Sequence, residues 1–178
     1  MPDSKFFETL KGYEGFSARA YLDSRGCRTV GYGSRLYPED AKWLKYIGHT
    51  LEGLMSGKES LTELEADRLM RWRFHQILAA VSRADILLYA SLGSDVRRVV
   101  DDLLYNLGPN FLAKFPKFRV CLHEYADTGN REWLMRAANE LEYRNGLDPS
   151  KGRTGYWNQT KRRAKANVAL LRGIAMGD

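Results

Sequence analysis

The feature that most constrains the fold is a capped, helix-forming run in the first half of the chain. Thr62 and Glu65 form a Thr-x-x-Glu capping box, in which each side chain bonds to the other residue's backbone N–H at a helix start. The following stretch, LEADRLMRWRFHQILAAVSRA, contains neither Gly nor Pro. It predicts a helix of about twenty residues, about 30 Å long, over residues 62–83. Its apolar side chains wrap much of its surface, which suits either a strut between two lobes or the centre of one core.

Strand signals are confined to the first quarter of the chain. Residues 17–37 combine Tyr21, Val30 and Tyr32, which favour extended backbone, with glycines that permit tight turns, namely Gly26, Gly31 and Gly33. The remainder reads as helices separated by Gly, Pro and Asn, with the best loop signal at residues 145–155. Segregated strands and helices predict an α+β fold, and 178 residues suit one domain.

Charge and composition narrow the classes of partner. The net charge of +6 favours anionic partners, which include nucleic acid, an anionic membrane face and a cell-wall polymer. No apolar run is long enough to cross a bilayer, and the first residues lack the pattern of a signal peptide, so we expect no stable membrane insertion. Cys27 and Cys121 are expected to be reduced thiols. The histidines lack metal-ligand spacing, so we expect neither metal nor cofactor.

Two carboxylates and a threonine lie in the strand-rich segment. Glu14 ends the first helix-forming stretch, and Asp23 and Thr29 lie among the turns that follow. Solvated side chains near turns are a common explanation for such residues. The alternative is a catalytic pair, because glycoside hydrolysis needs one carboxylic acid to protonate the leaving oxygen and one carboxylate to activate water. A threonine hydroxyl can hold such a water because it both donates and accepts.

The spacing of these residues resembles the signature of the phage T4-type lysozymes, the muramidases of glycoside hydrolase family 24. The signature is Glu-Gly, seven residues, Asp, five residues and Thr, followed by the tetrapeptide of residues 30–33. The likeness continues through the helix capped by Thr62, the YNLG stretch of residues 105–108 and the segment of residues 156–165. It therefore covers nearly the whole chain in order.

The resemblance implies an α+β, lysozyme-like fold within a single domain of residues 1–178. A small N-terminal β-hairpin lobe would span about 13–61 and a helical C-terminal lobe about 84–178, joined by the long helix of about 62–83. The helix of residues 3–12 is expected to pack on the C-terminal lobe, and the protein is expected to be a monomer. Asp102 matches a polar position of the family's core helix, and Asp101 is expected to be solvent-exposed.

The implied activity is that of an inverting N-acetylmuramidase. Glu14 would be the general acid, Asp23 the ionised partner, and Thr29 the residue that positions the attacking water. The resemblance also implies a set of substrate-binding residues, with Arg163 reaching toward the acid: Tyr32, Gly33, Leu36, Asn106, Trp157 and Arg163. The chain departs from the family at Ser34, where members often have His, and this change bears on local packing and substrate contacts rather than on the reaction.

The implied partner is bacterial peptidoglycan, and the implied role is that of a phage or prophage endolysin. Such a protein would accumulate in the host bacterial cytoplasm and act at the periplasmic cell wall after a holin-type partner opens the membrane. Two alternatives keep the fold, namely a wall-binding domain with weak catalysis and a lytic transglycosylase. A basic nucleic-acid binder rests on net charge alone, so we expect no nucleic-acid partner.

Overall fold

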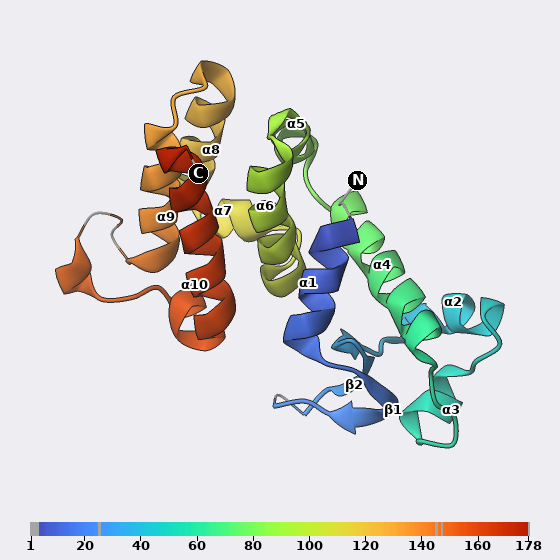
Figure 1. The fold of residues 1–178 in the computed structure, drawn as a ribbon. Helices are drawn as coiled ribbons and strands as arrows, with labels where there is room; N and C mark the ends of the chain where they lie inside the picture. Colours follow the sequence, from blue (N-terminus) through green and yellow to red (C-terminus); the bar gives the residue numbers. More distant parts are fainter. Residues whose placement is uncertain (1–3, 25, 145, 147, 178) are drawn as a thin grey trace. The chain divides into compact units, whose positions relative to one another are not determined.

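The computed structural model describes residues 4–24, 26–144, 146 and 148–177, and the chain divides into two compact units (Figure 1). One unit runs from Phe7 to Gln76 and carries the sheet. The other combines the residues up to Phe6 with those from Ile77 onward, and its regular structure is helical. The predicted α+β class is confirmed, because the named strands of the described residues all lie between Ser17 and Arg35.

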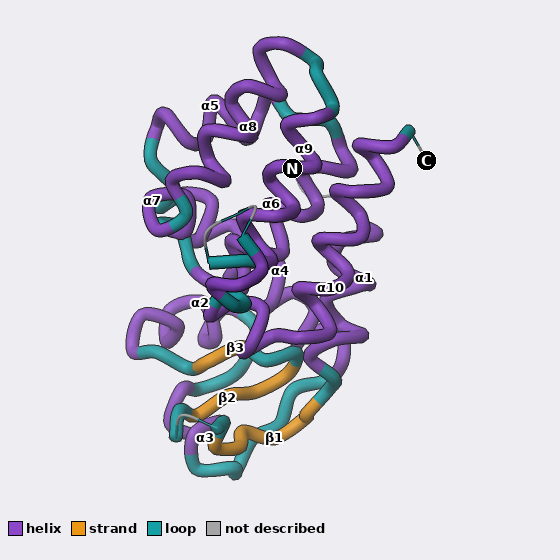
Figure 2. Tube along the Cα trace, turned by 90° about the vertical axis from the view of Figure 1, so that its left-hand side faces the viewer, coloured by secondary structure: helices purple, strands orange, loops and turns teal. Residues whose placement is uncertain are grey.

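The sheet consists of three antiparallel strands in the order β1 (Ser17–Leu22), β2 (Arg28–Gly31) and β3 (Ser34–Arg35), shown in Figure 2. Its register pairs Tyr21 with Thr29, and Thr29 with Arg35. Directly paired residues project from the same face of a sheet, so these three side chains form one row across all three strands. Val30 pairs with Ser34, and both are buried on the opposite face.

Most of α1 (Ser4–Glu14) and most of α4 (Glu63–Ala79) belong to the same unit as the sheet, together with η1 (Pro38–Asp40), α2 (Ala41–Tyr46) and α3 (Leu51–Met55). The contacts that hold α1 against α4 include an aromatic pair and an ion pair. The rings of Phe7 and Phe74 meet edge to face at 5.9 Å, and Lys11 Nζ lies 2.7 Å from Asp67 Oδ1. The C-terminal end of α1 is therefore fixed beside the sheet-bearing end of its unit.

The predicted start of the long helix is confirmed, but its predicted end at residue 83 is wrong. The Thr62 N–H donates to Glu65 Oε2 at 2.8 Å, and the Glu65 N–H donates to Thr62 Oγ1 at 3.3 Å, as a capping box requires. The helix ends at Ala79, because Ser82 adopts an extended conformation and its hydroxyl accepts from the Asp85 N–H. Ser82 thereby begins a new helix, α5 (Arg83–Ser91).

The helical unit continues with α6 (Ser94–Leu107), α7 (Phe111–Lys114), α8 (Pro116–Thr128), α9 (Glu132–Glu142), η2 (Pro149–Lys151) and α10 (Gly155–Met176). Figure 1 shows α9 packed alongside both α8 and α10. Thr154 caps α10 by accepting from the Trp157 N–H at 3.0 Å. The loop that precedes α10 is closed at its base by a bridge between Tyr143 and Arg153; residues 145 and 147 of the predicted loop lie outside the described residues.

The predicted solvent exposure of Asp101 is wrong. Its side chain is 1% exposed, and its carboxylate accepts a hydrogen bond from the Tyr89 hydroxyl at 2.8 Å. A buried carboxylate is tolerated when it is hydrogen-bonded, and Tyr89 supplies that partner from the neighbouring helix α5. None of the described helices is both long enough and apolar enough to cross a membrane.

Candidate active site

Glu14 is the last residue of α1, and its carboxylate lies directly against Gly33 in the turn between β2 and β3. A Cβ atom added to Gly33 would lie 2.5 Å from Glu14 Oε2, which is too close for a methyl group. The backbone of Gly33 also has a φ of +70°, a conformation that favours glycine. Glycine at this position therefore lets the carboxylate of Glu14 rest on the turn.

Asp23 follows β1 and uses both of its carboxylate oxygens. Oδ1 accepts from the Cys27 N–H at 2.9 Å, within the turn that joins β1 to β2. Oδ2 accepts from Arg35 Nε at 3.0 Å, from the far strand of the sheet. The Asp23–Arg35 ion pair is partly shielded, with side chains 19% and 32% exposed.

Thr29 is buried in the central strand, between Tyr21 and Arg35 in the row across the sheet. Its hydroxyl donates to the Cys27 carbonyl at 3.2 Å, the same residue whose N–H binds Asp23. A hydroxyl that donates its proton to the backbone keeps its lone pairs for accepting. Thr29 is thus set beside Asp23 through shared hydrogen bonds to one turn residue.

The sequence reasoning missed Tyr21 and Arg35. Tyr21 is 39% exposed, and its pKa is raised by burial and then by the negative charges of Glu14 and Asp23. One phenol therefore senses both carboxylates. The signal that would have found both residues is the hairpin register, because both lie directly opposite Thr29 on the neighbouring strands.

Three of the predicted substrate-binding residues lie in the same unit as Glu14. Gly33 contacts Glu14, as described above. The side chains of Tyr32 and Leu36 are only 7% and 8% exposed, and the Tyr32 ring packs on Phe16 with centroids 5.5 Å apart. Because the side chains of Tyr32 and Leu36 belong to the core, residues 32–36 would contact a ligand at these two positions through their backbone.

The other three predicted residues, Asn106, Trp157 and Arg163, belong to the helical unit. Arg163 donates to Asp102 Oδ1 from both Nε and Nη2, at 3.0 and 2.7 Å. Asn167 donates to the other oxygen of Asp102 at 2.7 Å. Burial, followed by the charge of Asp102, raises the pKa of the Tyr156 phenol. Arg163 is therefore part of a buried polar network on α6 and α10.

Trp157 and Asn106 are each half-buried. The Arg153 guanidinium stacks over the Trp157 ring at 4.5 Å and covers one face of it. The amide nitrogen of Asn106 is buried and has no hydrogen-bond partner among the described residues.

Ser34, where the family often has His, lies on the core face of β3 rather than beside Asp23. Its side-chain oxygen is buried and makes no hydrogen bond within the described part of the chain. Leaving a polar group unpaired costs about 1–3 kcal/mol. We therefore expect Ser34→Ala to leave the free energy of unfolding unchanged or to raise it by about 1 kcal/mol, with unchanged activity.

Urea unfolding and an activity assay of the Ser34→Ala variant test this expectation. A fall in stability of more than about 1 kcal/mol would show that the hydroxyl has a partner, and a fall in activity would place Ser34 in the site. Ser17→Ala, which also removes a serine hydroxyl from the sheet but from a half-buried residue, is the matched control.

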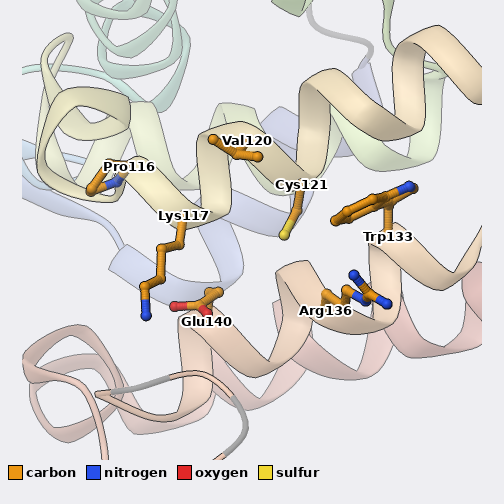
Figure 3. A pocket seen from close by; sticks show the side chains of 7 residues that line it. All are labelled: Pro116, Lys117, Val120, Cys121, Trp133, Arg136 and Glu140. Atoms are coloured by element: carbon orange, nitrogen blue, oxygen red, sulfur yellow. The ribbon is translucent and has the colours of Figure 1, made fainter.

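A separate pocket of about 350 Å³ lies between α8 and α9 in the helical unit (Figure 3). Lys117 and Glu140 lie together at one end, while Trp133 lies at the other with the Arg136 guanidinium 4.5 Å from its ring centroid. Burial raises the pKa of Glu140, and the positive charge of Lys117 opposes that rise. The remaining lining residues are Pro116, Val120 and Cys121. None of the residues assigned above to catalysis lines this pocket.

The described residues hold no cluster of three side chains able to bind a metal ion. Cys27 and Cys121 are both free thiols. The groups described around Glu14 and Asp23 include a hydroxyl, a phenol and a guanidinium.

Glycoside hydrolysis needs two carboxyl groups, and the sheet-bearing unit holds one at a helix end and one in a hairpin. The sequence model of the family described as phage lysozyme matches residues 11–119, which is more than half of the chain. The chain belongs to the phage lysozyme family, and it is accordingly a peptidoglycan-hydrolysing glycosidase. No curated protein matches the chain significantly. The family match contains Glu14, Asp23 and Thr29 but ends before Trp157 and Arg163.

Proposed function

We propose that the chain hydrolyses the β-1,4 bond between N-acetylmuramic acid and N-acetylglucosamine, with inversion of configuration. Glu14 is the general acid, Asp23 is the general base, and Thr29 helps to hold the attacking water. Membership of the phage lysozyme family supports the substrate class. The roles of the residues rest on the geometry around the sheet.

In the proposed reaction, the water attacks the anomeric carbon of the muramic acid residue and gives its proton to the Asp23 carboxylate. The bond from that carbon to the bridging oxygen breaks, and Glu14 delivers its proton to this leaving oxygen. One water is consumed and two hydroxyl ends are formed, so atoms and charge balance. Asp23 must be ionised and Glu14 protonated before the step begins.

The observation that carries the proposal is that both carboxylates are anchored on one short segment, residues 33–35. Glu14 rests on Gly33, and Asp23 is bound by Arg35 two residues further on. The two carboxylates therefore approach the same turn, one from the end of a helix and one from a hairpin.

Analysis of the products tests the proposal. Purified peptidoglycan is incubated with the chain, and the fragments are examined by mass spectrometry. Hydrolysis leaves reducing muramic acid ends, whereas a lytic transglycosylase leaves anhydro-muramic ends. Early NMR spectra of the cleaved glycan should show the α-anomer first. Anhydro ends or an initial β-anomer would overturn the reaction, and binding without cleavage would favour the wall-binding alternative.

We further propose that the protein is a monomeric endolysin that accumulates in the host bacterial cytoplasm and reaches the wall with the help of a holin-type partner. The net charge of +6 supports adsorption to an anionic wall. Induced expression in a Gram-negative host is expected to cause lysis only after the inner membrane is permeabilised. Lysis on induction alone would contradict the need for such a partner.

A further inference from the structure

Arg35 binds the carboxylate of Asp23 but has no role in the proposed reaction. Its Nε donates to Asp23 Oδ2 at 3.0 Å, and the Cys27 N–H binds the other oxygen of the same carboxylate. Because the two donors come from different segments, one from the turn and one from β3, they hold both the position and the rotation of the carboxylate.

Arg35 is itself held firmly at its backbone. Its carbonyl accepts from Arg73 Nη2 at 2.7 Å, and the same nitrogen lies 2.7 Å from Oδ2 of the fully buried Asp40. Arg35 is also fixed in register opposite Thr29. These contacts fix the backbone from which the Arg35 side chain reaches Asp23.

Charged and polar groups surround the Asp23–Arg35 ion pair. Glu14 and Asp23 both act on the phenol of Tyr21. Burial opposes the charge of Arg35, but hydrogen bonding with Tyr37 and the charges of Asp23 and Cys27 outweigh it and raise the pKa of Arg35. The guanidinium therefore stays charged beside Asp23.

We propose that Arg35 is a positioning residue that keeps Asp23 ionised and oriented as the base of the proposed reaction. An adjacent cation favours the ionised form of a carboxyl group, and two hydrogen-bond donors fix its orientation. The inference rests on the proposed function, since it assigns a cause to the ionised state of Asp23 that the reaction needs.

The pH dependence of activity tests this role. With Arg35 present, Asp23 remains ionised as the pH falls; without the guanidinium, Asp23 takes up a proton at a higher pH. We therefore expect Arg35→Gln to move the acid limb of the kcat profile upward by about one pH unit or more. Arg35→Lys retains a cation, so its acid limb should lie close to that of the native chain. In the Arg35→Gln variant, the activity at neutral pH should change less than the activity on the acid limb.

The matched control is Arg28→Gln, which removes the same charge from an exposed position on the neighbouring strand and should leave the profile unchanged. Circular dichroism of each variant reports folding. An unchanged acid limb in a folded Arg35→Gln variant would overturn the inference while leaving the proposed hydrolysis intact, provided that the native chain cleaves peptidoglycan.

A second readout does not depend on catalysis. The titration of the Asp23 carboxyl group is followed by NMR in the native chain and in the Arg35→Lys variant, which preserves charge and is the milder change. The two titrations are expected to agree closely, and the Arg35→Gln midpoint should lie higher. If the Arg35→Gln and native midpoints coincide, Arg35 is only a structural link between β3 and the turn, even if the chain has no activity.

Discussion

Replacing Glu14 with glutamine is expected to lower the rate of glycan cleavage by about a thousandfold or more. Glutamine has nearly the same shape as glutamate but has no acidic proton to give to the leaving oxygen. General acid catalysis typically contributes 10²–10⁴-fold, and departure of an unprotonated sugar oxygen is slow. Release of reducing ends from purified peptidoglycan measures the loss directly, and clearing of permeabilised Gram-negative cells measures it in a complete wall.

Glu8→Gln is the matched control for this variant. Glu8 lies on the same helix, α1, but its side chain is 65% exposed and pairs with Lys11 on the helix surface. The same chemical change there should leave activity within about twofold, since exposed ion pairs contribute little. Equal activity of the Glu14→Gln variant and the native chain would remove Glu14 from the role of the acid.

The second large effect is expected from Gly33→Ala. A methyl group at this position would lie 2.5 Å from Glu14 Oε2, so the carboxylate must move. Displacement of a catalytic group by about 1 Å can cost about a hundredfold in rate. The positive φ of Gly33 adds about 1–2 kcal/mol of strain for an alanine. We therefore expect activity to fall by about a hundredfold or more while the chain remains folded.

Gly31→Ala separates strain from displacement. Gly31 has a similar φ of +64°, but a methyl group there would meet the Cβ of Ala66 on α4 at 2.8 Å rather than Glu14. The Gly31→Ala variant should lose at least as much free energy of unfolding as the Gly33→Ala variant does. Its folded fraction should nevertheless retain more specific activity. Thermal unfolding and the cleavage rate of the folded fraction distinguish the two. Equal losses of activity would show that strain in the turn, rather than the position of Glu14, is responsible.

The buried network around Asp102 contains a contact that only the tertiary structure reveals. The resemblance placed Arg163 near the acid, and the structure pairs it with Asp102 on the neighbouring helix. The pairing joins residues 61 positions apart. No periodicity within either helix encodes such a contact, because it depends on how α6 and α10 pack.

Local signals were sufficient for much of the secondary structure. The capping box at Thr62 predicted where α4 begins, because its hydrogen bonds join residues only three positions apart. The same reasoning placed the end of this helix too late, since the extended backbone and new cap at Ser82 interrupt a run that has no Gly or Pro. The confinement of strand-forming residues to residues 17–37 predicted the α+β class.

By itself, then, the sequence determined the class of fold, the start of the central helix and the ordered spacing of Glu14, Asp23 and Thr29, because each depends on residue types and on hydrogen bonds between near neighbours. Only the tertiary structure decided that Gly33 receives the carboxylate of Glu14 and that Arg35 binds Asp23. Those contacts depend on strand register and on the packing of α1 beside the sheet. A shift of one residue in register would turn Arg35 to the opposite face and leave Asp23 without its cation.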